Sequence, residues 1–295
     1  MLLRVLSESG ISLERLVSFQ EVADRGSISA AAGGNPSRQS LISRQIGELE
    51  SALGVLLLQR DSRPHRLTKE GEDLAQICRE FFTGFSECLG RWQDQERVVS
   101  LASGESLLQW IIIPLVRTRT ELKKLKVRLA LKNMRTQDSI RALIDGKVDL
   151  ALVRQDAVPS GLEHDGEFAF EYRLVVPTNL MGSAMSKPGI AVLGSLPLVI
   201  MEGDGQLMNA VRSAAESASI PLDIRMECSS YPQIADTIAT MNWAGFLPQF
   251  TPSIKGTTQI ALPELKHLSR VLTLAWSPRR RQRRPEIGKV AKMLM

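Results

Sequence analysis

The chain has 295 residues, of which 43% are hydrophobic and 23% charged, so its length suits about two domains of roughly 150 residues each. Ordinary proportions of glycine, proline and aromatic residues exclude a collagen-like, a disordered or a disulfide-framework protein. The three cysteines, Cys78, Cys88 and Cys228, form no Cys-x-x-Cys pair, and their odd number predicts structural thiols in a reducing cytoplasm. The first ten residues lack the apolar core of a signal peptide, and no apolar run approaches the ~18 residues of a membrane span. We therefore expect a soluble, cytoplasmic protein with no membrane partner.

The net charge of +5 arises near the C-terminal end. Residues 278–295 hold seven arginines and lysines against one acidic residue, Glu286, so the rest of the chain is close to neutral. The basicity of the whole chain therefore says little about nucleic-acid binding. We expect the arginine run at residues 279–284 to be a solvated loop.

Residues 11–53 predict three helices in close succession, each with an apolar face at helical spacing. Ser27 is placed to cap the short second helix, Ile28–Ala32, which ends at a pair of glycines. A turn at residues 35–37 leads into the third helix. Its inward face carries Ile42, Ile46, Leu49 and Leu53. A short helix, a tight turn and a second helix form the pattern of a helix-turn-helix motif.

Small, polar and basic side chains occupy the first turns of the third helix. They are Arg38, Gln39, Ser40, Ser43 and Arg44. Arginine and glutamine can make bidentate contacts to base edges, serine can bond bases or phosphates, and a helix N-terminus attracts phosphate. Residues 38–69 hold six basic and three acidic side chains, so the local charge is positive. The sequence therefore predicts that this helix binds double-stranded DNA.

A polar, basic segment at residues 60–66, between two short apolar runs, predicts a β-wing that lies along the DNA backbone. Thr68 is placed to cap a long helix over residues 69–97 that carries an apolar stripe over more than three heptads. The stripe residues expected at a dimer interface are Leu74, Ile77, Phe81, Phe85 and Leu89. Pairing with a second copy would present two recognition helices to two half-sites.

From Val98 onward, apolar runs alternate with helical stretches, which predicts an α/β architecture with a largely parallel sheet. Ligand sites in such folds lie at the C-terminal ends of strands. The expected strands cover residues 98–102, 127–131, 149–153, 173–176, 196–201, 224–226 and 271–276. The expected helices cover residues 106–122, 136–144, 207–218 and 232–241.

Residues 13–71 resemble the N-terminal domain of LysR-type transcriptional regulators, with a signature in register over about sixty positions. The matching residues are Phe19, Gly26-Ser27, Ala31-Ala32, Gln39, Ser43-Arg44-Gln45-Ile46, Leu49-Glu50, Leu53-Gly54-Val55, Leu58-x-Arg60 and Leu67-Thr68-x-x-Gly71. The remainder resembles the effector-binding part of the same family, through Gly146-Lys147-Val148-Asp149-Leu150-Ala151 and through residues 173–177. The chain departs from the family pattern at Asn35, Ser37, Arg38 and Ser40, which predicts a different base preference.

The resemblance implies an N-terminal winged helix-turn-helix over residues 11–69, a linker and dimerisation helix over 70–97 and a two-lobed α/β effector-binding domain over 98–295. That domain resembles the type 2 periplasmic binding proteins, with lobe I over about 98–158 and 269–295 and lobe II over about 159–268. The implied partners are double-stranded DNA, a small-molecule effector, further copies in a homodimer or homotetramer, and RNA polymerase. No metal or other cofactor is implied.

The residues that the resemblance places against DNA are Ser27, Ser37, Arg38, Gln39, Ser40, Ser43, Arg44, Arg60, Arg63, His65 and Arg66. Those that it places against an effector between the lobes are Ser103, Ser106, Thr136, Glu202 and Phe246. Hydroxyls and helix N-termini suit an anionic ligand, although Glu105 beside them argues against a strongly anionic one. Trp243 stands where the family often has a Gly-rich segment, so we expect it to restrict the size of the ligand.

The sequence contains no motif that indicates catalysis: G-x-S-x-G, S-x-x-K, G-x-x-x-x-G-K-[ST] and a strand-linked G-x-G-x-x-G are all missing. Its three histidines and three cysteines have no metal-ligand spacing. Two alternatives stay open besides an effector-controlled regulator. One is a ligand-independent architectural or repressor protein whose cleft is closed by its own side chains. The other is a small-molecule-binding module with a vestigial DNA domain.

Overall fold

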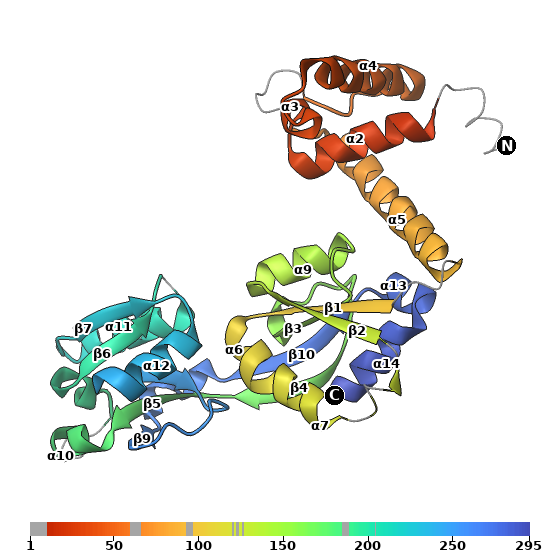
Figure 1. Cartoon of the computed structure of the whole chain (residues 1–295). Coiled ribbons are helices and arrows are strands. Elements are labelled where there is room, and N and C mark those ends of the chain that lie inside the picture. The colour runs from red at the N-terminus through yellow and green to blue at the C-terminus, as the bar shows by residue number, and fades with distance from the viewer. Residues whose placement is uncertain are drawn as a thin grey trace. The chain divides into compact units, whose positions relative to one another are not determined.

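A computed structural model describes residues 11–59, 66–92, 97–119, 121, 124–125, 127–184, 189–203 and 205–295. The chain divides into two compact units, Met1–Gln95 and Glu96–Met295. Figure 1 shows the helices and strands of both units.

The first unit packs three helices around one apolar core and continues into a long fourth helix (Figure 1). The four helices are α2 (Leu13–Arg25), α3 (Ile28–Ala32), α4 (Pro36–Leu53) and α5 (Lys69–Trp92). The side chains of Ser12, Ser27 and Asn35 cap α2, α3 and α4 by accepting hydrogen bonds from backbone amides of the first turns. The predicted helix-turn-helix is therefore confirmed, together with the Ser27 cap.

Three motif residues shape the chain between α4 and α5. The buried carboxylate of Glu50 accepts hydrogen bonds from the backbone amides of Leu57 and Leu58, at 2.7 and 3.1 Å. Thr68 accepts a hydrogen bond from the Gly71 amide at 3.0 Å, as a helix cap does. A Cβ atom on Gly71 would lie 2.2 Å from the carbonyl oxygen of Leu57, so this position requires glycine. Leu58 and Leu67 form an antiparallel bridge at the base of the predicted wing.

The second unit contains two five-stranded sheets (Figure 1). The first has the order β2-β1-β3-β10-β4, and the second has the order β7-β6-β8-β5-β9. The strands of the first sheet are β1 (Arg97–Ser103), β2 (Val127–Asn133), β3 (Leu150–Arg154), β4 (Glu163–Phe170) and β10 (Arg270–Trp276). Those of the second are β5 (Tyr172–Pro177), β6 (Pro197–Met201), β7 (Asp223–Cys228), β8 (Ala244–Pro248) and β9 (Thr257–Ile260).

Helices cover both faces of each sheet. On the first sheet, α7 (Ile113–Thr118) and α14 (Pro285–Leu294) pack on one face and α9 (Thr136–Ile144) on the other. On the second, α11 (Gln206–Ser217) and α12 (Tyr231–Met241) lie on opposite faces. The stretch before α7 consists of α6 (Glu105–Leu107) and a π-helical turn at Leu108–Ile112. The remaining helices are α10 (Met181–Ala184), α13 (Pro278–Arg283) and short 3-10 turns at Gln155–Ala157, Thr178–Leu180, Gly189–Ser195 and Pro263–Leu268.

The structure corrects the expected sheet order and the expected lobe boundary. Each sheet is mixed, because β10 runs antiparallel to both of its neighbours, β3 and β4, and β5 runs antiparallel to both β8 and β9. The strands β4, β8 and β9 were not predicted. Since β4 pairs with β10, it belongs to the first sheet, and the chain enters the second sheet at Tyr172 rather than near residue 159. The α/β class and the two-sheet division agree with expectation.

The arginine run near the C-terminal end is not a solvated loop. It forms α13, and Arg280 and Arg284 bond the carboxylate of Asp149 at 2.6 and 2.7 Å. The Asp149 side chain is 3% exposed, and the arginine side chains are 15% and 12% exposed. Ser100 completes the cluster, because its backbone amide and hydroxyl donate to the other Asp149 oxygen at 2.8 and 2.9 Å. The acidic residue of the Gly-x-x-Asp-Leu-Ala segment therefore anchors the C-terminal helices to the first sheet.

Candidate functional site

The polar and basic residues predicted to contact DNA lie together on the exposed face of α4. Its first half begins at the Asn35 cap and presents side chains to solvent, whereas its inward face packs on the core of the first unit. The exposed residues are Ser37, Arg38, Gln39, Ser40, Ser43 and Arg44. A helix that presents such a face from its N-terminal end has the geometry of a recognition helix.

Ion pairs at the surface hold two of the arginines in place. Arg38 donates to both carboxylate oxygens of Glu21, at 3.0 and 2.8 Å, with half of its side chain exposed. Arg44 lies 3.8 Å from Glu48, which also pairs with Arg15. Exposed pairs of this kind contribute about 0–1 kcal/mol, so both guanidinium groups can exchange their carboxylate for a phosphate or a base at little cost.

Two more of the predicted DNA contacts belong to the described residues, one at the start of α3 and one beside the Leu58–Leu67 bridge. Ser27 uses its hydroxyl to accept from the Ala30 amide at 3.1 Å, so its side chain serves the cap. Arg66 is exposed next to the Leu58–Leu67 bridge. Arg60, Arg63 and His65 lie outside the described residues.

An apolar stripe runs along α5 at every fourth residue. Ile77, Phe81, Phe85 and Leu89 are 64%, 51%, 48% and 37% exposed. The rings of Phe81 and Phe85 stack with centroids 6.2 Å apart. Leu74 is different, because it packs against the core of the first unit. The structure therefore corrects the placement of Leu74, and leaves the other four residues as a continuous apolar face.

Three of the predicted effector contacts lie at or next to helix N-termini in the second unit, with differing access. Ser103 is buried, and its hydroxyl donates to the Leu152 carbonyl oxygen at 2.6 Å, so it holds β1 to β3. Ser106 is buried in the first turn of α6, and Thr136 is half-buried at the start of α9. Glu202, after β6, is exposed and lies 3.9 Å from Arg135.

Phe246 is not placed to touch an effector. Its side chain is 2% exposed and packs among the aliphatic residues between the second sheet and α11. Trp243 is half-buried and packs on the opposite side of that sheet, beside α12. The family resemblance predicted that Phe246 contacts an effector, but its ring belongs to the core between the second sheet and α11.

Two polar features of this region were missed. Ser230, at the N-cap of α12, is buried, and its hydroxyl has no hydrogen-bond partner among the residues that the structure describes. A serine two residues before a proline is a helix-start signal, so the position could have been found from the sequence. The second feature joins α11 to the first sheet: Gln206, at the start of α11, accepts from Arg154 of β3 at 3.3 Å and also from Arg270 of β10.

Tyr231 follows Ser230 and has an unusual environment. Its ring lies 5.9 Å from the ring of Tyr172. Burial and the neighbouring Tyr172 raise the pKa of Tyr231 well above its ordinary value, against a smaller opposing effect of Arg270.

The described part of the chain holds no group of three or more His, Cys, Asp and Glu residues that could bind a metal ion. Within the same residues, no helix is both long and apolar enough to span a bilayer.

Comparison with known proteins agrees with this division of the chain. Residues 13–72 match the family model described as "Bacterial regulatory helix-turn-helix protein, lysR family". The regulator MetR of Salmonella typhimurium is 31% identical over 168 residues, or 56% of this chain and 52% of that protein. This chain thus aligns with about half the length of MetR. A probable nitrogen assimilation transcriptional activator of Synechococcus elongatus is 25% identical over 244 residues, covering 80% of this chain and 78% of that protein.

Two solved structures share the fold over nearly the whole chain. A full-length OxyR variant from Pseudomonas aeruginosa has a TM-score of 0.61 and 17% identity, over 96% of this chain and 94% of that one. Full-length CbnR in complex with its target DNA has a TM-score of 0.56 and 16% identity, over 97% and 100%. Residues 93–290 match the model described as "LysR substrate binding domain". Since this model alone covers more than half of the chain, the protein belongs to the LysR family of bacterial helix-turn-helix regulatory proteins.

Proposed function

We propose that the protein is a sequence-specific transcriptional regulator that inserts α4 into the major groove of DNA. The observation that carries this proposal is the exposed face of α4, where Gln39, Arg44 and their neighbours project from a capped helix start. The chain is a family member, and the similar CbnR is described in complex with its target DNA. Bidentate contacts from glutamine and arginine supply base readout, and the serines supply phosphate contacts.

The protein acts as a homodimer or as a homotetramer built from such dimers. The exposed stripe of Ile77, Phe81, Phe85 and Leu89 on α5 supports this assembly. Four large apolar side chains at every fourth position form a helix face that a partner helix can cover. Burying an exposed aromatic or aliphatic side chain contributes about 1.5–3 kcal/mol.

A small-molecule effector binds between the two sheets of the second unit and shifts the regulator between two arrangements. We assign to it three polar contacts, Ser106, Thr136 and Ser230. Ser230 has the best support of the three, because its buried hydroxyl has no partner among the described residues. The bonds of Gln206 with Arg154 and Arg270 join α11 to the first sheet. A movement of the two lobes toward each other around a ligand would therefore change these bonds. A ligand that prefers one arrangement changes the population of both. RNA polymerase is the partner through which such a change would reach transcription.

Selection of bound fragments from bacterial genomic DNA tests the DNA-binding proposal, followed by affinity measurements against salt for the best sequence and for a scrambled control. We expect an inverted repeat with half-sites about one helical turn or more apart. Gln39→Ala and Arg44→Ala should each weaken specific binding by about 1–3 kcal/mol and leave folding intact. Ser51→Ala, on the exposed last turn of the same helix, is the matched control and should bind as the wild type does.

Equal affinity for both DNAs, lost steeply with rising salt, would leave only electrostatic attraction and refute the proposal. Absence of DNA affinity at low salt, together with binding of a small molecule, would favour a ligand-binding module with a vestigial DNA domain.

A further inference from the structure

A cavity of about 580 Å³ lies on the face of the first sheet that carries α7 and α14. Its floor comes from β3, β10 and β4, through residues that include Leu152, Leu272 and Phe168. The π-helical turn and α7 form one wall, and the end of α14 forms another. Ser106, Thr136 and Ser230, which we assign to the effector, do not line this cavity. Its volume lies within the range of about 300–1,000 Å³ that is typical of ligand pockets.

Three irregularities of the backbone border this cavity. The π-helical turn at Leu108–Ile112 supplies Trp110, Ile111 and Ile112 to the wall. The register of β10 against β4 shifts between Leu272 and Leu274, which both line the floor. Gly166 has a φ of +73°, and a Cβ atom there would lie 3.2 Å from Cγ of Met295. Single π-turns and β-bulges cost regular hydrogen bonds and occur preferentially beside functional sites.

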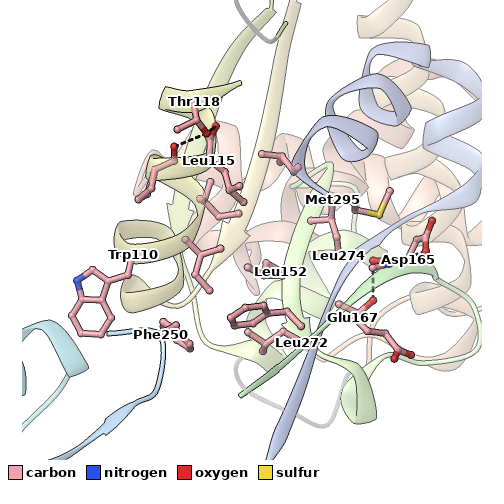
Figure 2. A pocket seen from close by; sticks show the side chains of 17 residues that line it. Trp110, Leu115, Thr118, Leu152, Asp165, Glu167, Phe250, Leu272, Leu274 and Met295 are labelled. Atoms are coloured by element: carbon pink, nitrogen blue, oxygen red, sulfur yellow. Dashed lines mark hydrogen bonds between the residues drawn. The ribbon is translucent and has the colours of Figure 1, made fainter. Parts of the chain in front are cut away.

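The chemical character of the cavity changes from one end to the other. In Figure 2, Trp110 and Phe250 lie at one end, Asp165 and Glu167 lie at the other, and leucines lie between them. The ring of Phe250 packs on Trp110 at 6.3 Å and on Phe168 at 5.9 Å between centroids. The two carboxylates are the charged side chains in the described lining, which contains no lysine or arginine.

Hydrogen-bond acceptors dominate the polar end. Asp165 accepts from the Gly166 amide at 2.7 Å, and Glu167 accepts from Gln155 at 2.9 Å, so each carboxylate has acceptor capacity left over. The hydroxyl of Thr118 donates to backbone carbonyl oxygens of its own helix, at 3.2 and 3.0 Å. A ligand must therefore bring its own donors and positive charge to the acidic end, and an aromatic or aliphatic body to the other.

We propose that this cavity is a second ligand site, which binds a small aromatic molecule carrying a protonated amine. The rings of Trp110, Phe168 and Phe250 receive the apolar body, and Asp165 and Glu167 receive the ammonium group. Phe250 follows β8 of the second sheet, whereas the other walls belong to the first lobe. A ligand held here touches both lobes and is coupled to the interlobe equilibrium by its differential affinity for the two arrangements.

Calorimetric titration of the full chain without DNA tests this site, with phenylbutylamine, phenylbutanol and phenylbutyrate as probes of one shape and three charges. We expect saturable binding of the amine, and about tenfold weaker binding of the carboxylate, since opposite charges attract and like charges repel at the acidic end. The double variant Asp165→Asn, Glu167→Gln should bind the amine no more tightly than the carboxylate. Its affinity for the alcohol should equal that of the wild type. The double variant Asp138→Asn, Glu216→Gln, which changes exposed acids in α9 and α11, controls for the same change in net charge.

A second variant removes part of the wall without disturbing the core. Phe168 is 42% exposed, so the Phe168→Ala variant should fold normally. For every probe that binds the wild type, its affinity should be lower by about threefold or more. The proposal is overturned if the amine shows no saturable binding, if its preference over the carboxylate is below about threefold, or if neither variant changes its affinity. Because no DNA is present, these outcomes are independent of whether the chain regulates transcription.

Discussion

The cluster around Asp149 makes a quantitative prediction about the stability of the second unit. Asp149→Ala removes a carboxylate that accepts from Arg280, Arg284 and Ser100. Its loss deprives the Arg280 side chain, which is 15% exposed, of this carboxylate, whereas Arg284 keeps its pair with Glu286 at 3.1 Å. Removal of one partner from a buried ion pair destabilises a protein by about 3–5 kcal/mol, because the remaining charge stays buried without compensation.

We expect Asp149→Ala to lower the free energy of unfolding of the second unit by about 4 kcal/mol. The charge left behind explains most of this loss. Combining Asp149→Ala with Arg280→Met should therefore restore part of the stability, because it removes the buried Arg280 charge that Asp149 compensates. Urea unfolding followed by tryptophan fluorescence is a suitable assay, since Trp276 lies in the core beside α14.

Arg281→Met is the matched control for this experiment. Arg281 belongs to the same arginine run, but it pairs with Glu163 at 3.4 Å with 48% of its side chain exposed. Such a surface pair contributes about 0–1 kcal/mol. Equal losses for Asp149→Ala and Arg281→Met, or a loss below about 1 kcal/mol for Asp149→Ala, would refute the role assigned to burial.

Three further predictions concern the first unit. Phe81→Glu should dissociate the dimer, because it places a charge in the centre of the exposed stripe on α5; sedimentation that shows an unchanged assembly would contradict the interface. Glu50→Ala should lower the free energy of unfolding of the unit by about 2–3 kcal/mol in urea, because two buried backbone amides lose their acceptor. An unchanged free energy of unfolding would contradict this role of Glu50. Burial raises the pKa of the Cys78 thiol to about 11. As the pH rises, the Cys78 thiol ionises at a lower pH in the unfolded chain than in the folded chain, so the free energy of unfolding should fall between about pH 9 and 11. The Cys78→Ala variant should lack this pH dependence. If the variant shows the same dependence, the assignment to Cys78 is wrong.

The helices of the first unit were predictable because their signals are local. Ser27 and Thr68 stand at cap positions, glycines follow helix ends, and apolar residues recur at helical spacing. Each of these signals depends on residues within one or two turns. The four exposed stripe residues of α5 were predictable for the same reason. Leu74 belongs to the same periodic pattern, but the core of its own unit lies beside it, and only the tertiary structure shows that.

The missed strands lack the local signals that define a strand. β4 is an edge strand whose sequence, Glu163–Phe170, is mostly polar and exposed. β8 contains a glycine and ends in a proline. β9 has only four residues and is an edge strand of the second sheet. These segments become strands because neighbouring strands offer unpaired backbone groups, and such pairing is set by topology rather than by propensity.

The fate of the arginine run shows how a charge pattern can mislead. A run of basic residues near a terminus contains no information about which of them meets a buried acid. Arg280 and Arg284 lie four residues apart, which places them on one side of the chain as it turns from α13 into α14. Asp149 lies more than one hundred residues earlier, and only the pairing of β3 with β1 and β10 brings it beneath them.

The two candidate ligand sites differ in how they depend on the sequence. A contact at a helix start, such as Ser230 at the N-cap of α12, can be found from the sequence, because a cap residue signals the helix and lies at its open end. Phe246 could not be assigned in this way, because all five residues of β8 are buried and alternation along the strand does not separate the cleft from the core. The cavity beside Trp110 is harder still, since it depends on a π-turn, a register shift and a glycine that lie in three distant segments. Irregular backbone has no periodic pattern to detect, so a site built from it is visible only once the chain has folded.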